Sequence, residues 1–194
     1  MRYINRDKKG SYGYLRSQFI FELIKTLVLF AMAFGIYLIG LINLGTNKSL
    51  WSVFAILAML PACKALVGAI MLGRFRSLDA AVYSKYEKSL GQVSRLYENV
   101  LTTSKKSYYL PVIACENNTL IGYLKSKSQN DIREITEHIN NVLKTDGHNS
   151  VTVKIYDKED DFIKRVEKMG ETIADGNRLA STAAIFDTIR AVSL

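Results

Sequence analysis

Long apolar runs dominate the first part of the chain. Residues 26–42 contain no charged side chain, and residues 50–72 contain only one, Lys64. A bilayer core about 30 Å thick is crossed by about 20 helical residues, and neither run has the polar face of a surface helix in a soluble protein. The residues between them, 43–49, are few and turn-forming. The pattern therefore predicts a hairpin of two membrane-spanning helices, at about residues 26–44 and 50–72.

Beyond the hairpin, shorter patterns predict a small domain at residues 77–194. Apolar residues three and four apart predict a helix at 77–97, which would connect the hairpin to this domain. Alternating and β-branched runs then predict three strands, a helix, a fourth strand and further helices. The strands are expected at residues 99–103, 108–115, 119–125 and 151–155. Pro111 lacks a backbone donor, so its strand should lie at a sheet edge or be locally irregular.

Charge determines the expected orientation. Residues 1–25 carry six basic and two acidic side chains, and residues 73–107 carry seven basic and three acidic ones. Basic residues stay on the cytosolic side of membranes, so residues 1–25 should form a basic cytosolic arm and helix start, with both termini cytoplasmic. The expected fold class is a membrane protein with an α-helical two-span hairpin (residues 26–72) followed by a small cytosolic α/β domain in the order α-β-β-β-α-β-α.

The same charge pattern predicts partners and location. The net charge is +8, but residues 108–194 have 11 basic and 13 acidic side chains, so the excess lies beside the hairpin. This distribution favours a bilayer with anionic headgroups as partner and argues against nucleic acid. A cleaved signal peptide is disfavoured by the long residues 1–25 and by a second span directly after the first. We expect a multi-pass protein of the cell (inner) membrane.

Small residues indicate how the helices pack. Five alanines alternate three and four apart along one face of the second helix: Ala55, Ala58, Ala62, Ala65 and Ala69. The first helix offers Ala31, Gly35 and Gly40. Small side chains allow close approach of helices in lipid, so the alanine stripe is a candidate seam within the hairpin. Contact with a second copy or with another membrane protein is the alternative.

Lys64 is a candidate site residue because it lies within a predicted span. A charged side chain there is either a contact for a partner or ligand, or a lysine that extends its ammonium group to the headgroups. Residues of the two helices whose numbers sum to about 93 should lie level. Glu22 is the nearest acid on the same side, too far away for an unstrained ion pair.

No catalytic set is recognisable. Cys63 and Cys115 are predicted in different environments, and two isolated histidines do not make a metal site or a triad. Glu159, Asp160 and Asp161 fit the first turn of a helix, where acidic side chains are electrostatically favoured; a metal cluster is the alternative. We therefore expect no catalytic residues, no cofactor and no metal.

The predicted element order is similar to the αβββαβ core of restriction-endonuclease-like nucleases, over about 80 residues. That resemblance implies a metal held by an acid early in the second strand and by an acid-x-Lys motif on the third. The third strand here reads Tyr123, Leu124, Lys125, and the second begins Tyr108, Tyr109. The metal ligands of the family are absent at these positions, so its activity is not carried over.

The expected function is therefore non-enzymatic. The domain would act as an adaptor, regulator or subunit at the inner membrane face, with a membrane-protein partner or a homo-oligomer as its assembly. Two alternatives remain: a membrane-tethered, degenerate nuclease-like domain, and a sensor of lipid or a small ligand that uses Lys64 and the basic flanks of the hairpin.

Overall fold

The computed structural model describes residues 9–44, 50–126, 128–171 and 178–194. The chain forms two compact units. One is Leu15–Arg76, and the other combines Met1–Tyr14 with Ser77–Leu194. The second unit is thus built from chain on both sides of the first.

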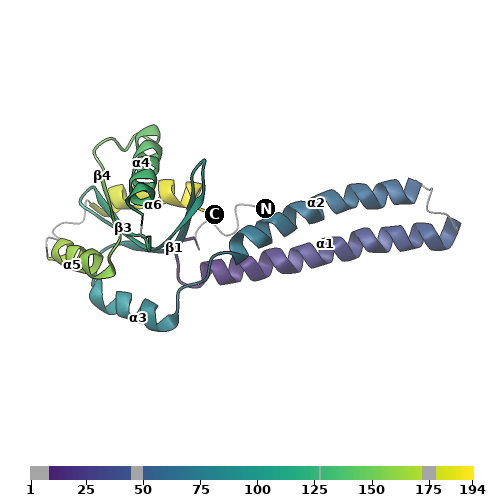
Figure 1. The fold of residues 1–194 in the computed structure, drawn as a ribbon, viewed down its shortest axis with the longest axis horizontal. Helices are drawn as coiled ribbons and strands as arrows, with labels where there is room; N and C mark the ends of the chain where they lie inside the picture. The colour runs from purple at the N-terminus through teal and green to yellow at the C-terminus, as the bar shows by residue number, and fades with distance from the viewer. Residues whose placement is uncertain (1–8, 45–49, 127, 172–177) are drawn as a thin grey trace. The chain divides into compact units, whose positions relative to one another are not determined.

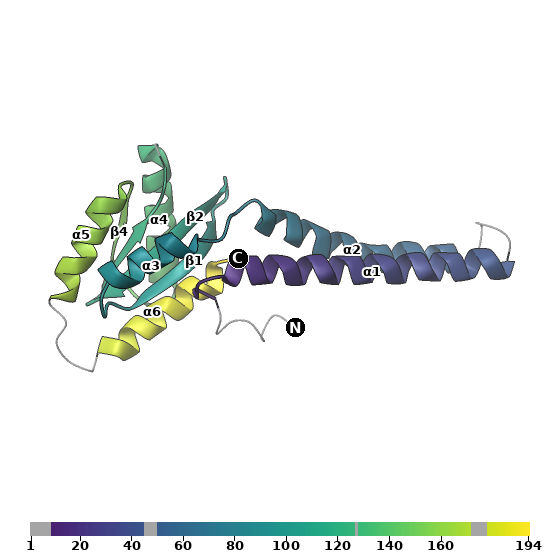
Figure 2. The same ribbon diagram turned by 90° about the horizontal axis from the view of Figure 1, so that it is seen from below.

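The first unit is a hairpin of two long helices, α1 (Tyr14–Leu44) and α2 (Leu50–Gly73), which run antiparallel (Figures 1 and 2). A Cβ atom on Gly73 would lie 2.9 Å from the Phe19 ring, and one on Gly68 would lie 3.9 Å from the Glu22 carboxylate. The numbers of each pair sum to 92 and 90, close to the value expected from the short turn. Pro61 lies inside α2 without ending it, as a proline can in an apolar helix.

Most large apolar side chains of this hairpin point outward. Leu27 is 69% exposed, Ile42 79% and Leu50 76%. Only about a fifth of the most apolar stretch of each helix is buried: 17% in α1 and 22% in α2. Both helices are long and apolar enough to cross a membrane. The core helix of a soluble protein and a signal sequence meet the same criteria of length and composition.

The second unit contains a four-stranded mixed sheet in the order β1-β2-β3-β4. The strands are β1 (Arg95–Thr102), β2 (Ser107–Glu116), β3 (Thr119–Tyr123) and β4 (Thr152–Tyr156). The first three pair antiparallel and β4 pairs parallel with β3. The helices are α3 (Ala80–Ser89), α4 (Gln129–Thr145), α5 (Glu159–Gly170) and α6 (Arg178–Val192). This small α/β domain has the element order that the sequence predicts.

Helices cover both faces of the sheet. Figure 1 shows α4 and α6 over one face and α3 and α5 over the other. Two hydrophobic clusters correspond to these layers. The first joins Leu110, Ile113 and Leu120 of the sheet to α4 and α6, and the second joins Val112 and Ile121 to α3 and α5. Both faces of β2 are buried, which explains its nearly continuous apolar sequence.

The connecting helix is shorter than the predicted 77–97. It ends at Ser89, and β1 begins at Arg95, earlier than the predicted residue 99. Gly91 has φ +55, a left-handed conformation that interrupts the helix. Leu90, Val93 and Tyr97 are nevertheless buried in one cluster with α3 residues. The apolar spacing identified the buried residues correctly but assigned them to the wrong element.

Pro111 lies in β2, which is an interior strand and not a sheet edge. The other predicted outcome therefore applies: the strand is locally irregular at this proline. Residue numbers of β1–β2 pairs sum to 209 on both sides of Glu98 and Pro111, which face each other and make no ladder pair. Glu98 has φ +54. The alternation of sheet faces shifts by one residue in both strands here, because Leu110 and Ile113 share one face. Each strand thus carries one extra residue at the same level.

Candidate functional site

The described residues do not bring together the groups of an evident catalytic centre. Within them, no three His, Cys, Asp or Glu side chains are close enough to hold a metal ion. Cys115 is fully buried, and this burial raises the pKa of its thiol to about 12. A thiol that stays protonated at neutral pH is a packing group rather than a nucleophile.

The positions implied by the nuclease resemblance serve packing and surface roles. The Tyr123 ring lies 6.4 Å from that of Phe162, at the face covered by α5. Lys125 follows β3 and is exposed. Tyr108 belongs to the hydrophobic cluster on the opposite face. These contacts account for the side chains without a metal site.

The acidic group at the start of α5 has an ordinary electrostatic explanation. Glu159, Asp160 and Asp161 occupy the first turn of the helix, where the backbone N–H groups favour negative charge. Glu159 also forms an ion pair with Lys85 of α3 at 2.8 Å. The pair links the two helices that cover this sheet face.

The alanine stripe lies inside the hairpin. Ala55, Ala62, Ala65 and Ala69 are at most 7% exposed, and Ala58 is partly exposed. The buried residues facing them on α1 recur every seven positions: Thr26, Ala33 and Gly40. The prediction for α1 was wrong at Ala31, which is exposed, and at Gly35, whose missing Cβ would contact nothing within 4 Å.

Lys64 lies on the outer side of α2, away from the alanine stripe. It is exposed, as are its apolar neighbours Leu57, Leu60 and Val67. Its ammonium group forms no hydrogen bond or ion pair with the residues that the structure describes. Glu22 instead pairs with Lys25 at 2.9 Å. Whether Lys64 binds a partner or extends to headgroups stays a prediction.

The sequence did not predict how the chain termini bind the outer edge of β1. The Tyr97 N–H donates to the Gly10 carbonyl at 2.7 Å. Further along the same edge, the Leu194 N–H donates to the Val100 carbonyl at 2.9 Å, and Leu101 bridges Ser193. We call residues 9–12 and 190–194 the terminal clasp. It satisfies edge groups that would otherwise be open to pairing with another chain.

The two halves of the clasp also bind each other. The Lys9 ammonium donates to the Ser193 carbonyl at 2.8 Å and to the Arg190 carbonyl at 3.3 Å. In return, the Arg190 guanidinium donates to the Lys9 carbonyl at 3.0 Å. A cation at the last carbonyls of α6 is favoured by the helix dipole. The residues joined here are 181 and 184 positions apart.

Aromatic contacts link the clasp to α3 and β1. The Tyr12 ring lies 4.2 Å from that of Tyr83, which meets the Tyr97 ring edge-on at 5.0 Å. The Tyr97 hydroxyl donates to Glu87 at 2.8 Å, and Arg95 pairs with the same carboxylate at 2.7 Å. The hydrogen bond from Tyr97, with the nearby Arg95, lowers the pKa of Glu87.

A buried carboxylate fixes the chain where the domain resumes after the hairpin. Glu98 is 2% exposed and accepts hydrogen bonds from the Ser77 hydroxyl and, at 2.8 Å, from the Leu78 N–H. Glu98 lies opposite Pro111, where the pairing of β1 with β2 is interrupted, and its backbone is left-handed at this position. Both segments that adjoin the hairpin, residues 9–14 and 77–78, are therefore bound to the same strand, β1.

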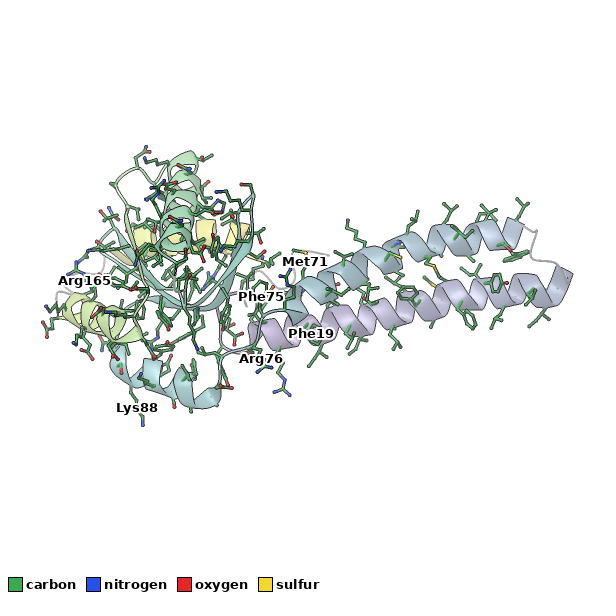
Figure 3. The ribbon with its side chains drawn as sticks, viewed as in Figure 1. Phe19, Met71, Phe75, Arg76, Lys88 and Arg165 are labelled. Atoms are coloured by element: carbon green, nitrogen blue, oxygen red, sulfur yellow. The ribbon has the colours of Figure 1, made fainter. Side chains whose placement is uncertain are left out.

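The hairpin itself carries an open apolar groove of about 560 Å³ between α1 and α2. At the end where α1 begins and α2 ends lie Phe19, Met71, Phe75 and Arg76 (Figure 3). No protein-family model, curated protein or solved structure matches the chain. The features that suggest a function are therefore the exposed apolar hairpin and the clasp.

Proposed function

We propose that the protein is a non-enzymatic integral membrane protein of the cell membrane. In this proposal, α1 and α2 span the bilayer, and the α/β domain is an adaptor, regulator or subunit at the cytosolic face. The exposed apolar surface of both helices supports membrane insertion. In water this surface would be a large unfavourable patch, whereas hydrocarbon is its preferred solvent.

The proposed topology rests on one observation, namely which segments of the chain form the α/β unit. Residues 9–14 precede the hairpin and residues 77–194 follow it, yet both belong to one compact unit. A domain of this kind lies on one side of a membrane. The chain between its two parts must therefore cross the bilayer an even number of times, as two spans do.

The distribution of charge supports a cytosolic location for the end of the hairpin that adjoins the α/β unit. The flanks of the hairpin within Leu15–Arg76 carry Arg16, Lys25, Arg74 and Arg76 against one acid, Glu22. The turn between the helices carries only Lys48. By the positive-inside rule, the end with four basic residues faces the cytosol.

Alkaline carbonate extraction of membranes tests the anchor. The full-length protein should stay in the membrane pellet, and so should Asn141→Asp, which adds a charge at an exposed position of α4. The double variant Met32→Asp and Leu57→Asp adds charges to exposed apolar positions of the hairpin. Each costs about 2.5–3.5 kcal/mol at a helix centre, so this variant should be depleted from the pellet. Release of the unaltered protein by carbonate would contradict the proposal.

The subunit role has a separate test. The size of the protein in a mild detergent extract of its native membrane should exceed that of the protein purified alone after overproduction. Equal sizes would remove the subunit role but leave the membrane anchor in place.

A further inference from the structure

The open groove on the hairpin is almost wholly apolar and runs along one side of the two helices. Leu23, Leu27, Phe30 and Phe34 line it from α1, and Met59 and Leu66 line it from α2. The α1 residues are spaced four, three and four apart and therefore share one helix face. The groove thus follows the helix axes, the direction in which lipid acyl chains lie.

One end of this groove is positively charged. Arg16 precedes Leu23 by seven residues, which places it on the same face of α1 and about 10 Å further along the axis. Arg74 directly follows the last residue of α2, and the Phe19–Gly73 contact places it near the level of Gln18, about 3 Å from that of Arg16 along the axis. Both arginines are exposed.

Neither arginine is neutralised nearby. Glu22, the one acid of the hairpin unit, pairs with Lys25 instead. Lys25 lies on the other side of the seam from the groove, since it is one residue before buried Thr26 whereas Leu27 is one residue after it. Among the described residues, Arg16 and Arg74 have no carboxylate within ion-pair distance. Their charge is available to a ligand.

We propose that this groove binds one anionic phospholipid, with an acyl chain along the groove and the phosphate held by Arg16 and Arg74. Guanidinium groups bind phosphate oxygens in bidentate geometry. The headgroup layer is about 5–8 Å thick on each side of the hydrocarbon, so residues about 10 Å apart along the helix reach phosphate and acyl chain together. This inference rests on the proposed function, because it requires an inserted hairpin.

A partner helix fits the groove less well than an acyl chain. Close helix packing in membranes uses small residues, and the buried alanines of α2 are already packed within the hairpin. Ala31 is the small residue that lines the groove, and it lies beside the larger Phe30, Phe34 and Met59. A flexible chain adapts to such side chains, whereas a second helix would be held away by them.

Tryptophan quenching tests the site in reconstituted full-length protein. Trp51 is the single tryptophan, so Trp51→Phe provides a silent background. Phe30→Trp then reports on the groove, and Val28→Trp reports on the outer side of α1 at nearly the same depth. The probe is phosphatidylglycerol with brominated acyl chains, mixed into phosphatidylcholine vesicles. Phe30→Trp should show at least about a fivefold preference for the anionic lipid, the equivalent of about 1 kcal/mol, which is what one basic residue contributes near the membrane surface. Val28→Trp should show almost none.

Variants that each remove one positive charge distinguish lipid binding at this groove from general electrostatic attraction of anionic lipid to the protein. Arg16→Gln should abolish most of the preference at Phe30→Trp, and Lys25→Gln, with the same change in net charge on the other side, should leave it. Equal quenching at both tryptophans, or a preference that survives Arg16→Gln, overturns the lipid site while leaving the anchor intact. Absence of quenching at both positions by brominated phosphatidylcholine overturns the membrane insertion itself, and the lipid site with it.

Discussion

Replacement of Gly10 by alanine should release the terminal clasp from β1. Gly10 has φ +83, a conformation that costs an L residue about 1–2 kcal/mol. A Cβ atom at this position would lie 2.5 Å from Leu96 Cδ2, within a well-packed contact. Forcing additional atoms into such a contact costs about 1–3 kcal/mol. The two penalties together disfavour the docked clasp by about 2 kcal/mol or more.

Gly13 provides a matched control in the same segment. It has φ +78, but a Cβ atom there would meet nothing within 4 Å. Gly13→Ala therefore carries the backbone penalty without the steric one. The difference between the two variants, about 1–3 kcal/mol, isolates the contact with Leu96.

Hydrogen–deuterium exchange measures the release directly. The Tyr97 amide donates to the Gly10 carbonyl, so it exchanges when the clasp opens. A cost of 2 kcal/mol corresponds to roughly 30-fold faster exchange in Gly10→Ala, at least about fivefold faster than in Gly13→Ala. Trypsin should also cleave after Lys9 more readily in Gly10→Ala. Equal exchange in the two variants, or exchange at the unaltered rate in both, would refute the reasoning.

Three further predictions concern the α/β domain. Both amide atoms of buried Asn99 lack hydrogen-bond partners among the described residues, so Asn99→Leu should raise the free energy of unfolding in urea by about 1–3 kcal/mol; a decrease would contradict this. The hydrogen bond from Tyr97 lowers the pKa of Glu87, so the stability it contributes is present above pH 4.5, the ordinary value, and is lost as the pH falls through the lowered one. Glu87→Gln should make the unfolding temperature less dependent on pH below pH 4.5. An unchanged dependence of the unfolding temperature on acid pH would count against the hydrogen bond between Tyr97 and Glu87. Cys115 is buried, so N-ethylmaleimide should label it only after the protein is denatured, as mass spectrometry of the labelled peptide would establish; labelling of Cys115 in the folded protein would contradict its packing.

The apolar runs and the order of elements were predictable because they depend on local pattern. The boundary between α3 and β1 was not. Leu90, Val93 and Tyr97 continue the apolar spacing of α3 and pack in its cluster, although the chain changes from helix to strand between them. The spacing of apolar residues predicts which side chains are buried. Here residues of α3 and of β1 are buried in the same cluster, so the spacing does not show where the helix ends.

The clasp illustrates a different limit. Residues 9–12 are polar and contain glycine, a composition typical of a loose segment. Their order depends on carbonyls at the far end of the chain, on the open edge of β1 and on the stacking of Tyr12 with Tyr83. Such contacts leave no periodic signal in the sequence. The groove between α1 and α2 was missed for the same reason, because its walls come from two helices whose rotation is set by the buried alanines.

The central claim is that both ends of the hairpin lie on the cytosolic side, and cysteine accessibility tests it most directly. Single cysteines Ser11→Cys, Ser49→Cys and Ser84→Cys would be placed in a background with Cys63 and Cys115 replaced by alanine. A membrane-impermeant maleimide should label only Ser49→Cys in intact spheroplasts, and all three after permeabilisation. Labelling of Ser11→Cys or Ser84→Cys before permeabilisation, or protection of Ser49→Cys, would contradict the proposed topology.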